Sequence, residues 1–162
     1  MSASADSARH DQTVTVYLRV SNTAAAIAFY EKAFGAVEQP GRLTMPGGKV
    51  GYASFVIGNS EVMISDESRE WDSPGPEMLG GTTVSLSLVV PNVDEVVARA
   101  QELGARVPSP PADQFYGHRS ARVYDPFGHC WVVSTVIEEV SPEEMQRRMD
   151  AWAASLAQPA ST

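Results

Sequence analysis

Residues 13–20 alternate strictly between polar and apolar side chains, which is the pattern of a strand that buries one face. The polar face of this predicted strand carries Thr15, Tyr17 and Arg19. Asn22 or Thr23 then caps a helix with apolar residues at helical spacing, and Gly35 suits its left-handed end. A strand followed by an amphipathic helix is therefore predicted for the start of the chain.

Two further strands are predicted at 50–57 and 61–65, joined by the turn residues Gly58 and Asn59. A short strand near 41–45 would complete a βαβββ unit. The polar stretch that follows is rich in Gly, Pro and acidic residues, so it is interpreted as a linker or a lid.

This unit is repeated about 70 residues later. The matched pairs are Leu18 and Leu88, Val20 and Val90, Asn22 and Asn92, Ala28 and Ala98, and Gly58 and Gly128. A strand at 83–90, a helix at 94–103 and strands near 119–124 and 129–135 are predicted in the second copy. Two copies of one supersecondary unit indicate that any active site lies between them.

The predicted organisation is α+β within one domain. Its parts are a disordered tail at 1–12, a first module at 13–66, a connecting loop at 67–81, a second module at 82–136, and a C-terminal helix and tail at 137–162. The helix begins at the capping pattern of Ser141 to Glu144. The helix carries an apolar stripe that must pack against another surface, and the stripe consists of Met145, Met149, Trp152 and Leu156.

Composition narrows the choice of partner. The 162 residues carry a net charge of −8, which argues against nucleic-acid and anionic membrane surfaces. A single cysteine, Cys130, and the absence of a secretory signal or a membrane-length apolar run favour a cytoplasmic location. Small molecules are the expected ligands.

Two segments carry a family resemblance, namely Phe29 to Gly35 on the first helix and Asp125 to His129 before the last strand. With the paired βαβββ units, they resemble the glyoxalase / bleomycin-resistance group, called the vicinal oxygen chelate superfamily. Residues 113–120, 128–131 and 140–144 look like its PhnB-like branch. The resemblance implies a curled eight-stranded mixed sheet around a cleft, commonly in a homodimer.

The resemblance also implies where a metal would bind. Metal-dependent members place His, Gln or Glu ligands on the first strand of each module and Glu on the last strands, and the PhnB-like branch often has histidine at two other positions. By spacing, these positions hold Thr15, Ser85, Val62, Val132, Tyr52 and Ser87. None offers the imidazole or carboxylate that a divalent ion needs, so we expect no metal and no cofactor. A one-residue shift would bring Glu61 or Tyr17 into the cleft instead.

The polar strand faces predict a site for an anionic or polyphenolic ligand. The predicted catalytic residues are His118, Tyr52 and Arg122, and the predicted substrate-binding residues are Thr15, Tyr17, Arg19, Ser54, Ser85, Ser87, Tyr116, Tyr124 and Val132. Arg122 and Tyr124 are included because they lie 70 residues after Tyr52 and Ser54, at the corresponding positions of the repeat. The alternative is that the tyrosines and arginines simply reach into solvent from strand edges.

Other residues are given structural roles. His129 is interpreted as a hydrogen-bonding residue beside a turn, Cys130 as a packed apolar group, and Trp131 as part of the core. Phe115, Tyr116, Trp131 and Trp71 are an alternative aromatic wall for a flat ligand.

Two functions are compatible with this pattern. The first is a metal-independent enzyme of the superfamily, a lyase, isomerase or cyclase that uses tyrosine, arginine and His118 for acid–base chemistry. The second is a binding protein of the bleomycin-resistance kind that sequesters a drug or metabolite. A catalytic group near a labile proton favours the enzyme, whereas aromatic walls and acidic rims favour sequestration.

Overall fold

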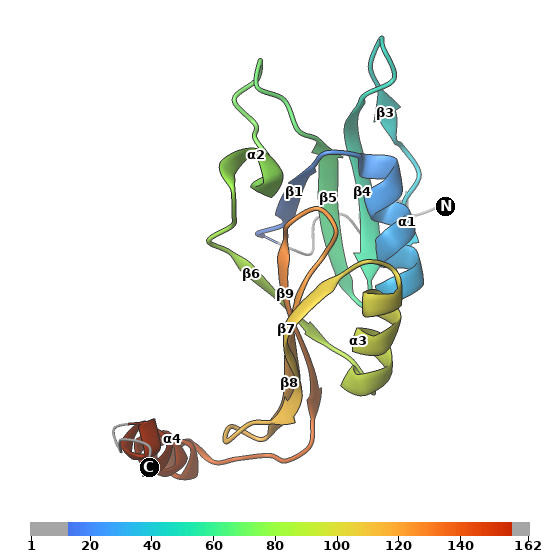
Figure 1. The fold of residues 1–162 in the computed structure, drawn as a ribbon. Coiled ribbons are helices and arrows are strands. Elements are labelled where there is room, and N and C mark those ends of the chain that lie inside the picture. The colour runs from blue at the N-terminus through green and yellow to red at the C-terminus, as the bar shows by residue number, and fades with distance from the viewer. Residues whose placement is uncertain (1–12, 157–162) are drawn as a thin grey trace.

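A computed structural model of the protein describes residues 13–156 and forms two modules joined end to end (Figure 1). The first module contains β1 (Val16–Val20), α1 (Thr23–Phe34), β2 (Val37–Glu38), β3 (Leu43–Thr44), β4 (Val50–Ile57) and β5 (Ser60–Asp66). The second contains β6 (Ser85–Val89), α3 (Val93–Glu102), β7 (Arg106–Asp113), β8 (His118–Tyr124) and β9 (Cys130–Val136). The connection includes α2 (Pro76–Leu79), and α4 (Pro142–Leu156) follows the second module. The predicted tails at 1–12 and 157–162 lie outside the described residues.

Each module builds its own mixed sheet. The first sheet has the order β1-β5-β4-β2 with β3 on β4, and the second has the order β6-β9-β8-β7. In both, the first strand runs parallel to the last strand of its module. The predicted α+β fold of paired modules is confirmed, but the strands form two sheets of five and four rather than one curled sheet of eight.

The repeat is visible in how the two helices begin. Asn22 caps α1 by accepting the Ala25 N–H at 3.0 Å, and Asn92 caps α3 by accepting the Glu95 N–H at 3.3 Å. Next to each cap, a side chain from the last strand of the module accepts a hydrogen bond from the N–H of the first residue in the helix. Asp66 does this for α1 and Thr135 for α3.

The repeat is not uniform along the chain. Ala53 pairs with Ile64 in the first sheet, and the buried pair at the same place in the second is Ala121 with Val133. A residue of β4 therefore corresponds to the residue 68 positions later in β8, not 70, because the second module has fewer residues between its helix and this strand. Arg122 consequently corresponds to Ser54, and Ser120 to Tyr52, so the predicted match of Tyr52 with Arg122 was two residues off.

Strand β7 was not predicted, because three of its eight residues are prolines (Pro108, Pro110 and Pro111). Proline cannot donate to a sheet, so such a segment is disfavoured as a central strand. β7 lies at the edge of the second sheet, where it pairs only with β8. An edge position tolerates the missing donors.

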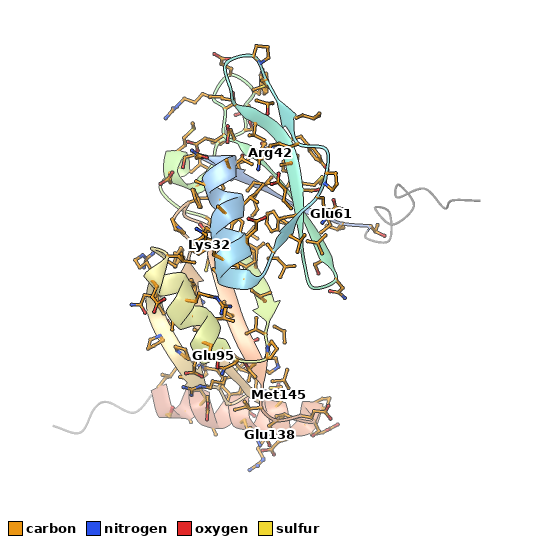
Figure 2. The ribbon with its side chains drawn as sticks, turned by 90° about the vertical axis from the view of Figure 1, so that its right-hand side faces the viewer. Lys32, Arg42, Glu61, Glu95, Glu138 and Met145 are labelled. Atoms are coloured by element: carbon orange, nitrogen blue, oxygen red, sulfur yellow. The ribbon has the colours of Figure 1, made fainter. Side chains whose placement is uncertain are left out.

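The modules meet mainly through α1 and α3, which lie one above the other along the same side of the molecule (Figure 2, Lys32 and Glu95). The Arg99 guanidinium on α3 donates to the Ala33 carbonyl on α1 at 3.0 and 3.2 Å. Beneath this contact, Tyr30 and Phe34 of α1 pack against Trp131 of β9. Trp131 is thus a core residue, as predicted.

One buried carboxylate connects the two modules. Asp125, in the turn before β9, accepts the Tyr30 hydroxyl at 2.7 Å, the Trp131 indole N–H at 2.9 Å, and the backbone N–H groups of Phe127 and His129. Burial, and then the charge of Asp125, raise the pKa of Tyr30 well above its ordinary value, so the phenol remains protonated as the donor. The network ties the first helix to the last turn.

His129 and Gly128 in the same turn hold the connection in place. His129 Nε2 lies 2.8 Å from the Arg19 carbonyl of β1, in agreement with the structural role predicted for this histidine. Gly128 adopts φ +89, and a Cβ there would lie 2.8 Å from the Pro76 Cβ of α2. Only glycine allows α2 to approach this closely.

The C-terminal helix α4 has no buried residue. It is held by the Arg148 guanidinium, which contacts Glu138, Glu144 and the Phe115 carbonyl, and by stacking of Trp152 on Phe115. The predicted apolar stripe therefore remains largely exposed in one chain, at the end of the molecule marked by Glu138 and Met145 (Figure 2). None of the helices within residues 13–156 is long and apolar enough to cross a membrane.

We expect Asp125→Asn to lower the free energy of unfolding by about 2–4 kcal/mol, because an amide cannot accept all four donors that the buried carboxylate satisfies. Urea denaturation followed by circular dichroism measures the change. Asp113→Asn is the matched control, since Asp113 is exposed and its carboxylate forms an exposed ion pair with Arg119. Equal stability of the two variants would contradict a central role for Asp125.

Candidate functional site

Each sheet has one face covered by α1 or α3 and one face turned away from them, which we call the open face. In the first sheet, Leu18, Ala53, Phe55 and Ile64 are buried toward α1. Strand alternation places the other set on the open face, namely Tyr17, Arg19, Tyr52, Ser54, Glu61, Met63 and Ser65. In the second sheet the open face carries Ser85, Ser87, Val89, Arg106, His118, Ser120, Arg122, Tyr124, Cys130, Val132, Ser134 and Val136.

On the first sheet, Tyr17 and Arg19 form a fixed pair. The Arg19 guanidinium lies 3.7 Å from the centre of the Tyr17 ring and donates to the Ser65 hydroxyl. Tyr17 in turn donates to the Gly51 carbonyl at 3.3 Å, and its ring meets Tyr52 edge-on. The pair lines a cavity of about 520 Å³, closed on the other side by residues 74–83 and His129.

On the second sheet, Ser87, Val132 and Arg122 occupy one row across three strands. Arg122 is exposed, and its guanidinium forms no hydrogen bond or ion pair with any residue of the described chain. An arginine without a partner on a sheet face has all its donors available to a ligand. Next to it, Arg106 stacks over Tyr124 with its guanidinium carbon 4.3 Å from the ring centre.

His118 lies at the far end of the same strand. Its Nδ1 is 3.3 Å from the Ser134 hydroxyl, and its ring centre is 5.6 Å from that of Tyr116, whose hydroxyl contacts Ser120. Four residues along a strand separate His118 from Arg122, which is about 13 Å. The histidine therefore has a polar surrounding of its own rather than direct contact with the arginine.

The arginines and tyrosines predicted to converge are divided between two sheets in one chain. Tyr17, Arg19, Tyr52 and Ser54 lie on the first sheet, whereas the other predicted residues from Ser85 to Val132 lie on or beside the second. Thr15 directly precedes β1. Figure 1 shows the sheets one above the other rather than face to face. Within residues 13–156, the open faces of the two sheets do not face each other across one cleft.

A groove of about 700 Å³ lies at the seam of the modules instead. It runs between β6 and the turn that joins β4 to β5, and Val16, Val84, Val89 and Trp131 contribute apolar side chains. Three of these are exposed valines on or next to the strands that form the free sheet edges.

The residues at the expected metal positions do not fit a metal. Val62 faces the core, so the side chain beside Tyr17 on the open face is Met63, and the corresponding pair on the second sheet is Ser87 with Val132. Glu61 shares the open face, as a one-residue shift predicted. Within residues 13–156, no three His, Cys, Asp or Glu side chains lie close enough to bind one ion.

Several open-face residues were missed by the sequence argument. Arg106 was missed because its strand was not predicted, and Ser120 because the repeat was applied with a constant offset. Ser134 and Met63 carry no signal beyond strand alternation. That alternation, once the register is known, identifies all of them.

The sequence profile of the Glyoxalase/Bleomycin resistance protein/Dioxygenase superfamily matches residues 11–133. The chain belongs to this superfamily. Among its relatives, the uncharacterized protein Mb0911c of Mycobacterium bovis is 38% identical over 144 residues, which cover 87% of this chain and 94% of the relative. The uncharacterized protein Rv0887c of Mycobacterium tuberculosis is also 38% identical, over 87% of this chain and 84% of its own.

Several solved structures share this fold. The fosfomycin resistance protein FosX of Listeria monocytogenes superposes with a TM-score of 0.61 at 20% identity, covering 83% of this chain and 98% of its own. TioX of Micromonospora sp. ML1 gives 0.60 at 24% identity, with coverages of 77% and 98%. The PhnB protein of Bacillus cereus gives 0.60 at 19% identity, with coverages of 76% and 99%.

We expect protein purified without chelator to contain no stoichiometric zinc, iron, nickel or manganese, because no donor set in the described chain suits such an ion. Elemental analysis by inductively coupled plasma mass spectrometry measures this directly. Ligand binding should be unchanged after treatment with EDTA. One equivalent of bound metal, together with binding lost on its removal, would contradict this expectation.

Proposed function

We propose that this superfamily member binds a small organic anion on the open faces of its sheets. Its charge distribution carries the proposal, because the chain as a whole has a net charge of −8. Arg19, Arg106, Arg122 and His118 nevertheless gather on the open faces, where the strands contribute only one carboxylate, that of Glu61. Such segregation attracts anions to a surface that the rest of the molecule would repel.

The same faces hold groups suited to acid–base chemistry. Arg122 would orient a carboxylate or enolate through paired hydrogen bonds, the Tyr52 phenol would donate a proton, and His118 would accept one. We therefore assign a metal-independent lyase, isomerase or cyclase activity, in the cytoplasm and in the PhnB-like branch. The His118 ring is oriented by the hydrogen bond between its Nδ1 and the Ser134 hydroxyl.

Tyr52 lies on the first sheet, whereas Arg122 and His118 lie on the second, so the three can line one cleft if two chains combine. We infer a homodimer in which the first sheet of one copy faces the second sheet of the other. Strands β1 and β6 support it, because each pairs on one side only within the described chain and exposes valines beside its free edge. A second copy would cover both edges at once and close a cleft between the open faces.

Sequestration of a drug or metabolite is the second candidate. Its support is the Tyr17, Tyr52 and Tyr124 rings beside the arginines, which suit stacking on a flat ligand without chemistry. FosX, a resistance protein by name, shares the fold. Nuclear magnetic resonance spectra of a ligand before and after incubation separate the two functions, since only an enzyme changes the ligand.

We expect Arg122→Gln to weaken binding of 4-hydroxybenzoate by about ten-fold or more, because the bidentate contact to the carboxylate is lost. Isothermal titration calorimetry measures the affinity. Lys49→Gln is the control, as Lys49 is an exposed cation outside the open faces. Equal binding of the uncharged 4-hydroxybenzamide, or equal loss in both variants, would contradict recognition of the anion by Arg122.

We expect the wild-type protein to sediment as a dimer and Val89→Asp to raise its dissociation constant by at least about ten-fold, because an unpaired carboxylate would enter the β6 interface. Analytical ultracentrifugation over a concentration series measures this constant. Val37→Asp is a matched control, since Val37 and Val89 are both 61% exposed. Val37 lies in β2, at the edge of the first sheet opposite β1. A monomeric wild type would contradict the inferred dimer.

A further inference from the structure

The segment around α2 separates two neighbouring cavities. The first, of about 520 Å³, contains Arg19, and the second, of about 390 Å³, contains Arg106. The residues that line both cavities all belong to this segment, and they are Pro76, Gly80, Gly81 and Thr82. We call residues 75–82 the strap.

The strap is fixed at its start. The Gly75 N–H donates to the Glu67 carboxylate at 3.1 Å, and Pro76 rests directly on Gly128. Gly128 lines the second cavity, and the next residue, His129, lines the first. Consecutive residues are about 3.8 Å apart, so the two cavities lie next to each other at this turn.

Each cavity contains the same recognition element, an arginine stacked on a tyrosine. Arg19 lies over Tyr17 at 3.7 Å and Arg106 over Tyr124 at 4.3 Å, measured to the ring centres. Stacking uses the flat face of the guanidinium and leaves its edge N–H groups for a carboxylate. Arg19 gives one donor to Ser65, and the Arg106 guanidinium makes no ion pair or hydrogen bond with any part of the described chain.

We propose that the two cavities form one bipartite site for a small organic dianion, with one carboxylate on Arg19, the other on Arg106, and the strap across the middle of the ligand. The inference rests on the proposed binding of organic anions and specifies the ligand class. Pro74, Leu79 and the two tyrosine rings provide apolar walls for the carbon chain between the charges.

Glu77 gives the proposal a distinctive consequence. Glu77 lines the second cavity, and within the described chain it forms no ion pair with Arg106. A negative charge beside the arginine opposes an incoming carboxylate, so removing it should strengthen binding of a dianion. A variant that gains affinity cannot be explained by loss of the fold.

The test is isothermal titration calorimetry with the α,ω-dicarboxylates succinate, glutarate, adipate and suberate, each compared with the monocarboxylate of equal chain length. We expect one length to bind at least about ten-fold more tightly than its monocarboxylate, because the second contact is made within the same complex. Arg19→Gln and Arg106→Gln should each reduce that dicarboxylate to about the affinity of the monocarboxylate. Glu77→Gln should raise its affinity about three-fold.

Arg69→Gln is the matched control, because Arg69 is an exposed arginine of the same connection that lines neither cavity. Thermal unfolding checks that all variants remain folded. Absence of any chain-length preference, or dependence on only one of the two arginines, would overturn the bipartite site. If 4-hydroxybenzoate still binds in an Arg122-dependent way, the proposed function survives that result, whereas failure of every anion to bind rejects both.

Discussion

The buried carboxylate of Asp125 is the interaction on which the arrangement of this protein depends. It accepts hydrogen bonds from Tyr30 of the first module and from Trp131, Phe127 and His129 of the second. A buried charge is stable only when its oxygens are fully paired, so both modules must be in place for the turn to form. Together with the contact between α1 and α3, this network fixes the orientation of the two sheets, and hence where the residues on their open faces lie.

The turn at Asp125 also positions the candidate site. His129 fixes β1 through the Arg19 carbonyl, and Gly128 supports the strap through Pro76. The Arg19 side chain is thereby held between Tyr17 and Ser65, and the strap is held above it. Core packing and ligand recognition are consequently connected through three residues of one turn, Asp125, Gly128 and His129.

Much of the fold was predictable from the sequence, because alternation and capping are local signals. The cap at Asn22 and its repeat at Asn92 identified both helices, and the superfamily membership inferred from the turn at Asp125 was confirmed. Strand β7 was not predictable in this way, since its prolines are compatible with a strand only at an edge, and edge position depends on tertiary structure.

The candidate site was predictable only in part. Alternation correctly grouped Tyr17 with Arg19, but it carried no information on whether two faces of distant strands meet. The positions of Val62 and Tyr52 show the second limit, because a constant repeat offset fails once residues are inserted or lost between strands. Both errors concern long-range geometry rather than residue chemistry.

The proline-rich edge of the second sheet has a consequence for solubility and assembly. Strand β7 lacks three backbone N–H donors because it contains Pro108, Pro110 and Pro111. Another strand therefore cannot pair with this edge in continuous register. The opposite edge, β6, has no proline and keeps all its donors. The second sheet can therefore accept a continuous strand from another copy at β6 but not at β7, which limits strand addition to one side of this sheet.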